Sequence, residues 1–184
     1  MTVRTDLPIA HHLGFAVRDA DKTAEAYTRL LGGEFRLMPP YQVKSLEGEP
    51  AELRVYYGAI AGTIVEIIQT VKGNTPHGDW VKEHGDGIQH LGLYVPDVAA
   101  ATREMLAKGG EIRWVYPSAG VVQLSLRSTV DEILGETLPS SLTYIEPGEG
   151  GVILELLGPP IHTGVVGTVV KGLEDFFETR FPPV

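Results

Sequence analysis

A duplicated motif is the feature that most constrains what this chain can fold into. Residues 12–19 read HLGFAVRD and residues 90–97 read HLGLYVPD, so His, Leu, Gly, Val and Asp recur in the same places. Repeated supersecondary units stack on one another because neither unit can bury its apolar face alone. The sequence therefore predicts two related halves, at about residues 11–70 and 88–158.

A helix is expected directly after each copy of the motif, at about residues 20–31 and 98–108. An Asp stands at each N-cap position, where its carboxylate accepts from backbone N–H groups of the first turn. A Gly stands near each helix end, where a left-handed residue commonly terminates a helix. These capping residues are Asp19 with Gly32 and Asp97 with Gly109.

An apolar, strand-like run comes later in each half: TIVEIIQ at 63–69 and GVILELLG at 151–158. Such runs are rich in Val, Ile and Leu and are typical of half-buried or buried strands. Together with the first strand and the helix, they predict one βαβββ module in each half. The expected fold class is α+β, with paired modules that form a curled mixed sheet.

The two modules are expected to occupy residues 1–78 and 79–159, joined through a Gly-rich linker that holds a short helix at about 79–84. An extra stretch at 117–140 interrupts the second module. In the tail, residues 160–184, Val and Phe recur at helical spacing. We expect the tail to form a helix that packs at or near a homodimer contact.

Alternation along the strands gives each half one imidazole and one carboxylate on the same face. The apolar residues of the first strand share the face that packs under the following helix, so His12 lies on the other face. The second copy and the two later strands follow the same alternation. The residues placed on the face away from the helices are His12, Glu66, His90 and Glu155. Gly14 and Gly92, two places after each His, leave room there for a bulky group.

A lone charge inside an apolar strand needs a partner, because an ionised carboxylate is costly to bury alone. Glu66 and Glu155 are in this position, and one divalent ion would compensate both. Two imidazoles and two carboxylates suit Zn, Ni, Co, Mn or Fe(II), with two coordination positions left open. Recurrence in both halves favours this metal site over a structural role. The other His residues are interpreted as structural, from their alternation or their turn-rich surroundings: His11, His77, His84 and His162.

Composition excludes several function classes. The absence of Cys excludes disulfides, Cys-ligated zinc and a thiol nucleophile. A net charge of −9 makes the chain a poor partner for nucleic acid or an anionic membrane. No apolar run is long enough for a membrane-spanning helix, and the first residues lack a signal-peptide pattern. We therefore expect a cytoplasmic protein that acts on a small molecule.

The whole pattern resembles the vicinal oxygen chelate superfamily, which includes glyoxalase I, methylmalonyl-CoA epimerase, extradiol dioxygenases and bleomycin-resistance proteins. The resemblance implies a glyoxalase-like sheet curled around a metal whose ligands come from the first and last strand of each module. These strands hold the four His and Glu residues already selected by alternation. Within the superfamily, HHLGFAVRDADKTAEAYTRLLG, WVKEHGDGIQHLGLYV and EPGEGGVILELLG are most similar to methylmalonyl-CoA epimerase.

This resemblance implies a metal-dependent epimerase or isomerase. Such an enzyme moves a proton next to a metal-bound carbonyl, through an enediolate, on a small-molecule substrate for which an acyl-CoA is a candidate. Glu155, Glu66 and Glu52 are the candidate bases; Glu52 opens the strand ELRVYY. Arg54 shares its alternation and is a candidate clamp for a substrate carboxylate. The alternative for both residues is an exposed salt bridge at the start of the strand. Tyr94, on the metal face of its strand, is a further candidate for substrate binding.

Three alternative functions use the same scaffold. A glyoxalase I-type lyase acting on a thiol adduct would use the same four metal ligands. An Fe(II) extradiol dioxygenase normally has two His and one carboxylate, so a fourth ligand argues against ring cleavage. A non-catalytic ligand-binding or resistance protein of this family often lacks the metal ligands, all of which are present here.

Overall fold

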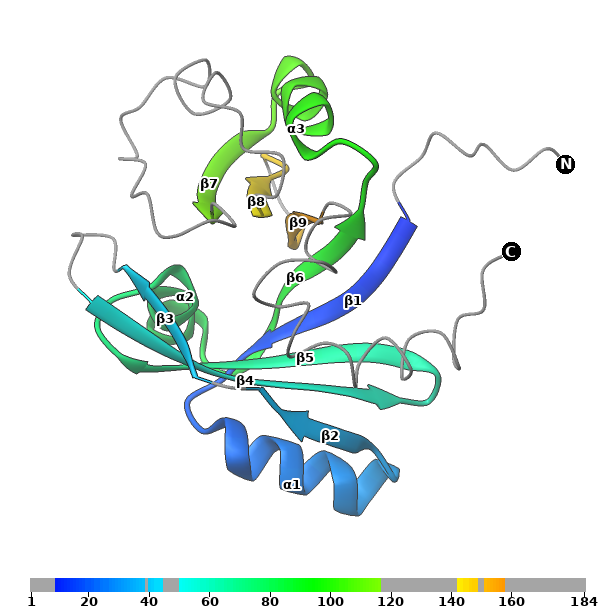
Figure 1. Cartoon of the computed structure of the whole chain (residues 1–184), viewed down its shortest axis with the longest axis vertical. Helices are drawn as coiled ribbons and strands as arrows, with labels where there is room; N and C mark the ends of the chain where they lie inside the picture. The colour runs from blue at the N-terminus through cyan, green and yellow to red at the C-terminus, as the bar shows by residue number, and fades with distance from the viewer. Residues whose placement is uncertain (1–8, 39, 45–49, 117–141, 149–150, 158–184) are drawn as a thin grey trace, which may run out of the picture.

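Two related units, each with a strand, a helix and then further strands, share one sheet in the computed structural model, which describes residues 9–38, 40–44, 50–116, 142–148 and 151–157 (Figure 1). The elements of the first unit are β1 (Ile9–Ala16), α1 (Ala20–Leu31), β2 (Glu34–Leu37), β3 (Tyr41–Lys44), β4 (Pro50–Ile60) and β5 (Thr63–Lys72). Helix α2 (Pro76–His84) links the units. The elements of the second unit are β6 (Gly87–Tyr94), α3 (Val98–Ala107), β7 (Glu111–Tyr116), β8 (Leu142–Glu146) and β9 (Ile153–Leu157).

The strand order is β2-β4-β5-β1-β6-β9-β8-β7, and β3 pairs with the part of β4 that β2 leaves free. Strands β1 and β6 pair antiparallel at the centre. On either side of them, β1 pairs parallel with β5 and β6 pairs parallel with β9. Each unit is therefore built outward in the same order from the β1–β6 pair. The sheet is curled, so that β4 and β5 run across the view of Figure 1 while β8 and β9 are seen nearly end-on. The predicted α+β class with two modules in one curled sheet is confirmed.

Helices α1 and α3 each cover an apolar core on the outer face of their own unit. The first core is formed by Val17, Ala20, Ala24, Val65 and Ile67, and the second by Val95, Val98, Ile145 and Leu156. Both cores contain strand residues of the alternation set opposite to the His and Glu positions, as predicted. No helix in the described part of the chain is long and apolar enough to cross a membrane.

The predicted helix ends are confirmed. Asp19 caps α1 by accepting from the backbone N–H of Lys22 at 3.0 Å, and Asp97 caps α3 by accepting from Ala100 at 2.9 Å. Gly32, directly after α1, has a φ of 65°, and Gly109, one residue after the C-cap Lys108 of α3, has a φ of 94°. Such values favour glycine because it has no Cβ.

The linker helix α2 begins three residues earlier than the predicted residue 79. Thr75 is its N-cap, with a side chain that accepts from the backbone N–H of Gly78, and Pro76 stands in the first turn. Proline is well tolerated there because that N–H has no helical partner. The earlier start places His77 inside the helix and not in a turn.

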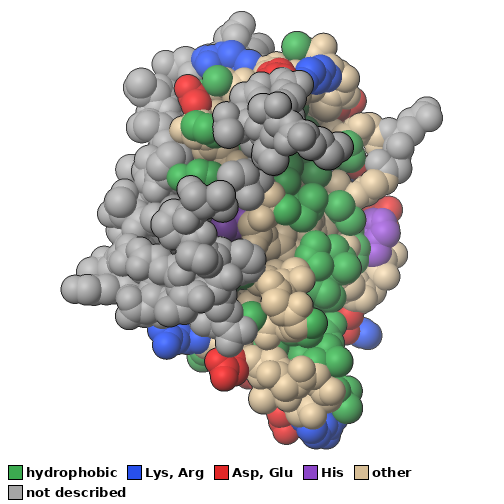
Figure 2. All heavy atoms as spheres, turned by 90° about the vertical axis from the view of Figure 1, so that its right-hand side faces the viewer, with side chains coloured by type: hydrophobic (Ala, Val, Ile, Leu, Met, Phe, Trp, Pro, Cys, Tyr) green, Lys and Arg blue, Asp and Glu red, His purple; other side chains and the backbone are tan. Residues whose placement is uncertain are grey.

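Hydrophobic side chains reach the surface in a band on the face drawn in Figure 2. Among the described residues, Leu30 and Leu31 at the end of α1 are the most exposed large apolar side chains.

Three predictions of the sequence analysis lie outside the described residues: the 117–140 insert, the helix in the 160–184 tail, and the structural role of His162. The homodimer contact and the module boundaries therefore stay predictions.

Candidate metal centre

Two rows of paired residues cross the centre of the sheet and bring the four predicted side chains together. Backbone register aligns neighbours across β5, β1, β6 and β9, and aligned neighbours share a face of the sheet. One row is Glu66, Gly14 and His90; the other is His12, Gly92 and Glu155. Each unit thus contributes its His to one row and its Glu to the other.

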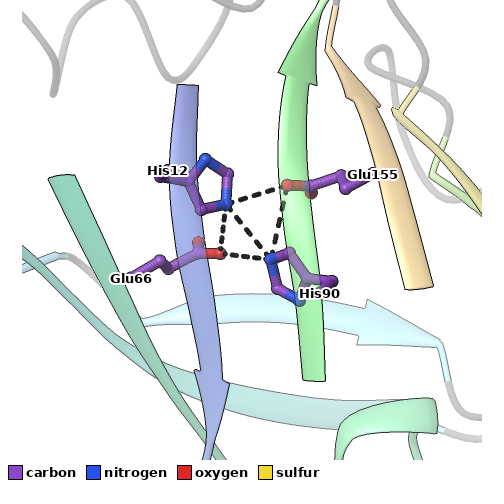
Figure 3. A group of neighbouring side chains, drawn as sticks. All are labelled: His12, Glu66, His90 and Glu155. Atoms are coloured by element: carbon purple, nitrogen blue, oxygen red, sulfur yellow. Dashed lines mark hydrogen bonds and ion pairs between the residues drawn. The ribbon is translucent and has the colours of Figure 1, made fainter. Parts of the chain in front are cut away.

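The four side chains point at one another from the two rows (Figure 3). One nitrogen or oxygen from each lies within 4.8 Å of all the others. His12 Nε2 is 3.0 Å from Glu155 Oε2, 3.3 Å from Glu66 Oε2 and 3.1 Å from His90 Nε2. His90 Nε2 is 3.2 Å from the Glu66 oxygen and 3.5 Å from the Glu155 oxygen. All four residues are buried.

Each glycine of the two rows makes room for the imidazole of the other unit. A Cβ on Gly14 would lie 1.9 Å from Cε1 of His90, and a Cβ on Gly92 would lie 2.3 Å from Cε1 of His12. Real Cβ atoms do not approach other atoms this closely. The bulky group that the sequence predicted beside each glycine is therefore the ring from the opposite half.

Electrostatics couples the protonation of the four groups. Burial by itself lowers the pKa of His12, but hydrogen bonds and charges from Glu155 and Glu66 outweigh it and raise that pKa from 6.5 to about 10. Burial raises the pKa of Glu66, yet the hydrogen bonds of His12 and His90 hold it well below 4.5. The pKa of Glu155 is also lowered, because the charge of His90 and the hydrogen bond of His12 outweigh burial. Without a metal, a proton on His12 thus compensates part of the charge of two ionised carboxylates.

The group fits a cation better than it fits a closed set of hydrogen bonds. Among the described residues, the buried Oε2 of Glu155 has no neutral hydrogen-bond donor and is met by ionic contacts with His12 Nε2 at 3.0 Å and His90 Nε2 at 3.5 Å. The Nε2 atoms of His12 and His90 face each other at 3.1 Å, so at most one proton can lie between them. Lone pairs of two nitrogens and two carboxylates therefore converge on one volume. This buried donor set could hold a metal ion.

Behind His90, two further buried side chains complete its hydrogen bonding. Gln89 Oε1 lies 3.2 Å from His90 Nδ1 and 2.6 Å from His77 Nδ1. Burial, together with the nearby charge of His90, lowers the pKa of His77 to about 4. The sequence analysis interpreted His77 as a structural residue in a turn; it lies in α2, and its ring centroid is 6.1 Å from that of His90. The only local signal for this placement was the Thr-Pro pair that starts α2.

Behind His12, the Nδ1 atom of His11 lies 2.8 Å from the Nδ1 atom of His12. Strict alternation predicted that His11 would point to the other face. The register of β1 against β6 shifts between Ala10 and His12, so His11 is the extra residue of a β-bulge. A bulge depends on the partner strand, which explains why alternation along β1 alone did not predict this contact.

Each of the two rows is extended by one tyrosine, which pairs with the Glu of that row. Tyr57 pairs with Glu66, and Tyr144 pairs with Glu155. The Tyr144 hydroxyl donates to Glu155 Oε1 at 2.5 Å. The ring centroids of Tyr144 and His90 are 5.4 Å apart. The ring centroids of Tyr57 and His12 are 5.8 Å apart. Sequence reasoning missed both tyrosines, since they lie two strands away from the motif.

The remaining predicted site residues lie elsewhere. Arg54 donates to Asp21 of α1 at 2.7 Å, and the Tyr56 hydroxyl donates to the same carboxylate, so this side of β4 faces the helix. Alternation puts Glu52 on the Arg54 side, away from the four-residue group. Tyr94 lies on the metal face of β6, partly buried. The roles of these three residues in proton transfer and substrate binding stay predictions.

Comparison with solved structures shows the same fold. Methylmalonyl-CoA epimerase from Mycobacterium tuberculosis is 22% identical, with a TM-score of 0.57 over 86% of this chain and 93% of that one. A hypothetical protein from Bacillus halodurans is 16% identical, with a TM-score of 0.54 over 82% and 94%. A methylmalonyl-CoA epimerase in complex with methylmalonyl-CoA and NH4+ is 20% identical, with a TM-score of 0.51 over 83% and 94%. At these identities the likeness extends to the fold alone.

A search of curated proteins gives no match to this chain. The family model described as the glyoxalase/bleomycin resistance protein/dioxygenase superfamily matches residues 11–123, more than half of the chain. The match spans the first unit, the linker helix and the second copy of the motif. The resemblance noted from the repeated motif is thereby confirmed, and the chain belongs to the glyoxalase/bleomycin resistance protein/dioxygenase superfamily.

Proposed function

We propose that this chain is a metal-dependent enzyme that moves a proton on a carbon next to a carbonyl, as an epimerase or isomerase. The observation that carries this proposal is the buried convergence of His12, Glu66, His90 and Glu155 within 4.8 Å. The fold shared with methylmalonyl-CoA epimerases supports the same reaction class.

The four residues of the group would hold one divalent ion, and their mixed nitrogen and oxygen donors suit Zn, Ni, Co, Mn or Fe(II). When bound, such an ion supplies a Lewis acid that polarises a substrate carbonyl and makes the neighbouring C–H more acidic. The fold of the sheet fixes the four donors before binding, because each comes from a central strand and is buried.

Proton movement is assigned to the carboxylates of the chain. Glu66 and Glu155 come from opposite rows, and the pKa of each is lowered, so both are ionised bases at neutral pH. Epimerisation removes a proton from one side of a carbon and returns one to the other side, so one carboxylate acts as the base and the second, after taking a proton from solvent, acts as the acid. Two carboxylates on opposite sides of the group meet that need. Glu52 stays the alternative base of the sequence analysis, although alternation puts it on the helix side of β4 with Arg54.

The substrate is proposed to be a small carbonyl compound, with an acyl-CoA thioester as the first candidate. One structural neighbour is crystallised with methylmalonyl-CoA. A net charge of −9 disfavours a polyanion in general. A CoA ester would therefore need local positive charge, and binding is expected to weaken as local Lys or Arg residues are removed.

Deuterium exchange tests the proposal. The protein is loaded with Co²⁺ or Ni²⁺ and incubated in heavy water with methylmalonyl-CoA, other 2-substituted acyl-CoAs and thiol adducts of 2-oxoaldehydes. The expected result is loss of the α-proton signal by NMR with an acyl-CoA, absent in the metal-free protein and in Glu155→Gln. Exchange with the thiol adducts alone would replace epimerase with a glyoxalase-type activity. Oxygen consumption with a catechol, without any α-proton exchange, would overturn the proposal in favour of ring cleavage.

A further inference from the structure

We infer that Gln89 is a positioning residue that fixes the tautomer of His90 and aims its Nε2 at the metal. It does so from a β-bulge, and it connects the ring to His77 of the linker helix. The inference concerns the metal centre of the proposed function and rests on it. Nothing in the duplicated motif pointed to Gln89, which precedes the motif by one residue.

A break in strand register turns Gln89 inward. Between β1 and β6, Gly14 pairs with His90, whereas the next residue, Phe15, pairs with Ile88. Gln89 is thus an extra residue on β6. Regular alternation would send Gln89 and His90 to opposite faces, but a bulge re-aims a side chain. Both side chains are buried, and they contact each other at 3.2 Å.

The hydrogen bonds of Gln89 determine its orientation. Its Nε2 donates to the backbone carbonyl of Pro76 at 3.2 Å. A carbonyl oxygen can only accept, so the amide nitrogen of Gln89 must face it and the amide oxygen must face the two imidazoles. That oxygen can only accept in turn, so it places a hydrogen on Nδ1 of both His90 and His77.

The tautomer of His90 follows from this arrangement. When the ring is neutral, hydrogen on Nδ1 leaves the lone pair on Nε2, which faces Glu66 Oε2 at 3.2 Å and His12 Nε2 at 3.1 Å. Only the charged ring, which carries hydrogen on both nitrogens, donates from Nε2 to Glu66. A metal takes that lone pair, and the second nitrogen of a ligating His commonly donates to an oxygen that fixes the ring. Gln89 supplies this oxygen, and the Pro76 and His77 contacts hold Gln89 itself.

The first unit repeats the device with a different residue. His11 is the bulge residue before His12, as Gln89 is before His90, and its Nδ1 lies 2.8 Å from that of His12. In both strands, therefore, the residue before the ligand leaves regular alternation and contacts Nδ1 of the ligand. Two bulges at equivalent positions with equivalent contacts indicate a role at the centre. Gln89 differs in being buried and in carrying no titratable group.

The test compares Gln89→Met, which keeps the shape and removes the oxygen, with Gln89→Glu, which keeps an oxygen acceptor. The matched control is Gln69→Met: Gln69 Oε1 accepts from the Ala20 backbone on the helix side of β5, away from the centre. Nitrogen-15 NMR of the imidazoles reads the tautomer of His90 in the metal-free chain and in the Zn²⁺-loaded chain. Competition with a chelator measures Zn²⁺ affinity.

We expect the wild type and Gln89→Glu to show the Nδ1–H tautomer of His90. Gln89→Met is expected to lose it and to bind Zn²⁺ about 10–100-fold more weakly, as for other outer partners of ligating His. Gln69→Met is expected to keep wild-type affinity. An Nε2–H tautomer in the metal-free wild type would overturn the inference, even if Gln89→Met fails to fold. Wild-type affinity in a folded Gln89→Met would overturn it too. Both readouts are independent of turnover, so they separate this inference from the proposed reaction.

Discussion

The two halves of the sheet supply the same groups to the centre but support them differently. Each gives one His from its first strand and one Glu from its last, with a glycine opposite the ring of the other half. The support of the second half is a buried chain, Gln89 with His77, and the Tyr144 hydroxyl bound to Glu155. The first half uses His11, which is partly exposed. Duplication thus fixes where the ligands stand, whereas the residues behind them differ between the copies.

The difference extends to charge. In the metal-free protein the two carboxylates raise the pKa of His12 to about 10, so this ring is protonated on both nitrogens and positively charged at neutral pH. Burial lowers the pKa of His77, behind the other ring, to about 4, so His77 is neutral there. In the first half, therefore, a metal must displace a proton from His12. In the second half, the ring of His90 is held from behind by Gln89, whose other partner, His77, is neutral.

The largest expected effect is equal in the two halves. Glu66→Gln and Glu155→Gln keep the shape of the side chain and remove the charge. Each is expected to weaken metal binding and to lower turnover by about 10²–10⁴-fold. Metal titration and α-proton exchange measure both quantities, with Glu25→Gln, on the exposed side of α1, as the control. A loss confined to one of the two glutamates would show that the halves are not equivalent in the reaction.

The next effect is a pH dependence that originates in the first half. Because the folded pKa of His12 is raised from 6.5 to about 10, its contribution to stability is complete below about pH 6.5 and is lost as the pH rises through 10. The lowered pKa values of Glu66 and Glu155 give a contribution that is present above 4.5 and is lost as the pH falls. The pKa of His77, lowered from 6.5 to about 4, gives a further contribution that is complete above about pH 6.5 and is lost as the pH falls toward 4. The metal-free protein is therefore expected to be most stable near pH 6.5.

Metal binding should reverse the trend above pH 6.5. Zn²⁺ displaces the proton of His12, so its apparent affinity should rise about tenfold per pH unit up to about pH 10. Thermal unfolding with and without Zn²⁺, from pH 6.5 to 9, measures this as a growing Tm difference. His12→Gln is the control that should remove the slope of the metal-free protein. A Tm difference that does not change with pH would mean that His12 is neutral before the metal binds.

The third prediction concerns the glycines that interlock the halves. Gly14→Ala and Gly92→Ala place a methyl 1.9 Å and 2.3 Å from a buried imidazole, which cannot turn away without leaving the centre. Overpacking of this kind costs about 1–3 kcal/mol of unfolding free energy, and metal binding should be lost. Denaturant unfolding and metal titration measure the two effects. Gly87→Ala, on β6 with Trp80 at 3.2 Å, is the milder control. Retained metal binding in Gly14→Ala would show that the rings are mobile.

The smallest predicted effect tests the support of the second half. Tyr144→Phe removes the hydroxyl that donates to Glu155 Oε1 and leaves the ring in place. Zn²⁺ affinity is expected to fall about tenfold, as for other outer partners of a metal ligand. Tyr57→Phe changes the equivalent position beside Glu66 and is the matched variant. Equal losses in the two variants would indicate that the first half has a comparable support.

The repeated motif and its alternation were enough to predict the modules, the helix caps and the four side chains of the centre. These features depend on local rules. The capping of α1 by Asp19 needs only the residues of the first turn, and strand period 2 determines that His12 and Glu66 lie opposite the helix. A sequence carries such rules within a few residues of where they act.

Only the tertiary structure decided how these parts meet. The antiparallel pairing of β1 with β6 sets Gly14 against His90 and Gly92 against His12, and no local pattern specifies that register. The same pairing creates the bulges that turn His11 and Gln89 inward, against the alternation of their own strands. Long-range pairing also brings the linker helix behind the centre. A strand's own sequence sets its two faces, but the partner strand sets its register, so the outer support of the metal ligands could not be predicted from the chain alone.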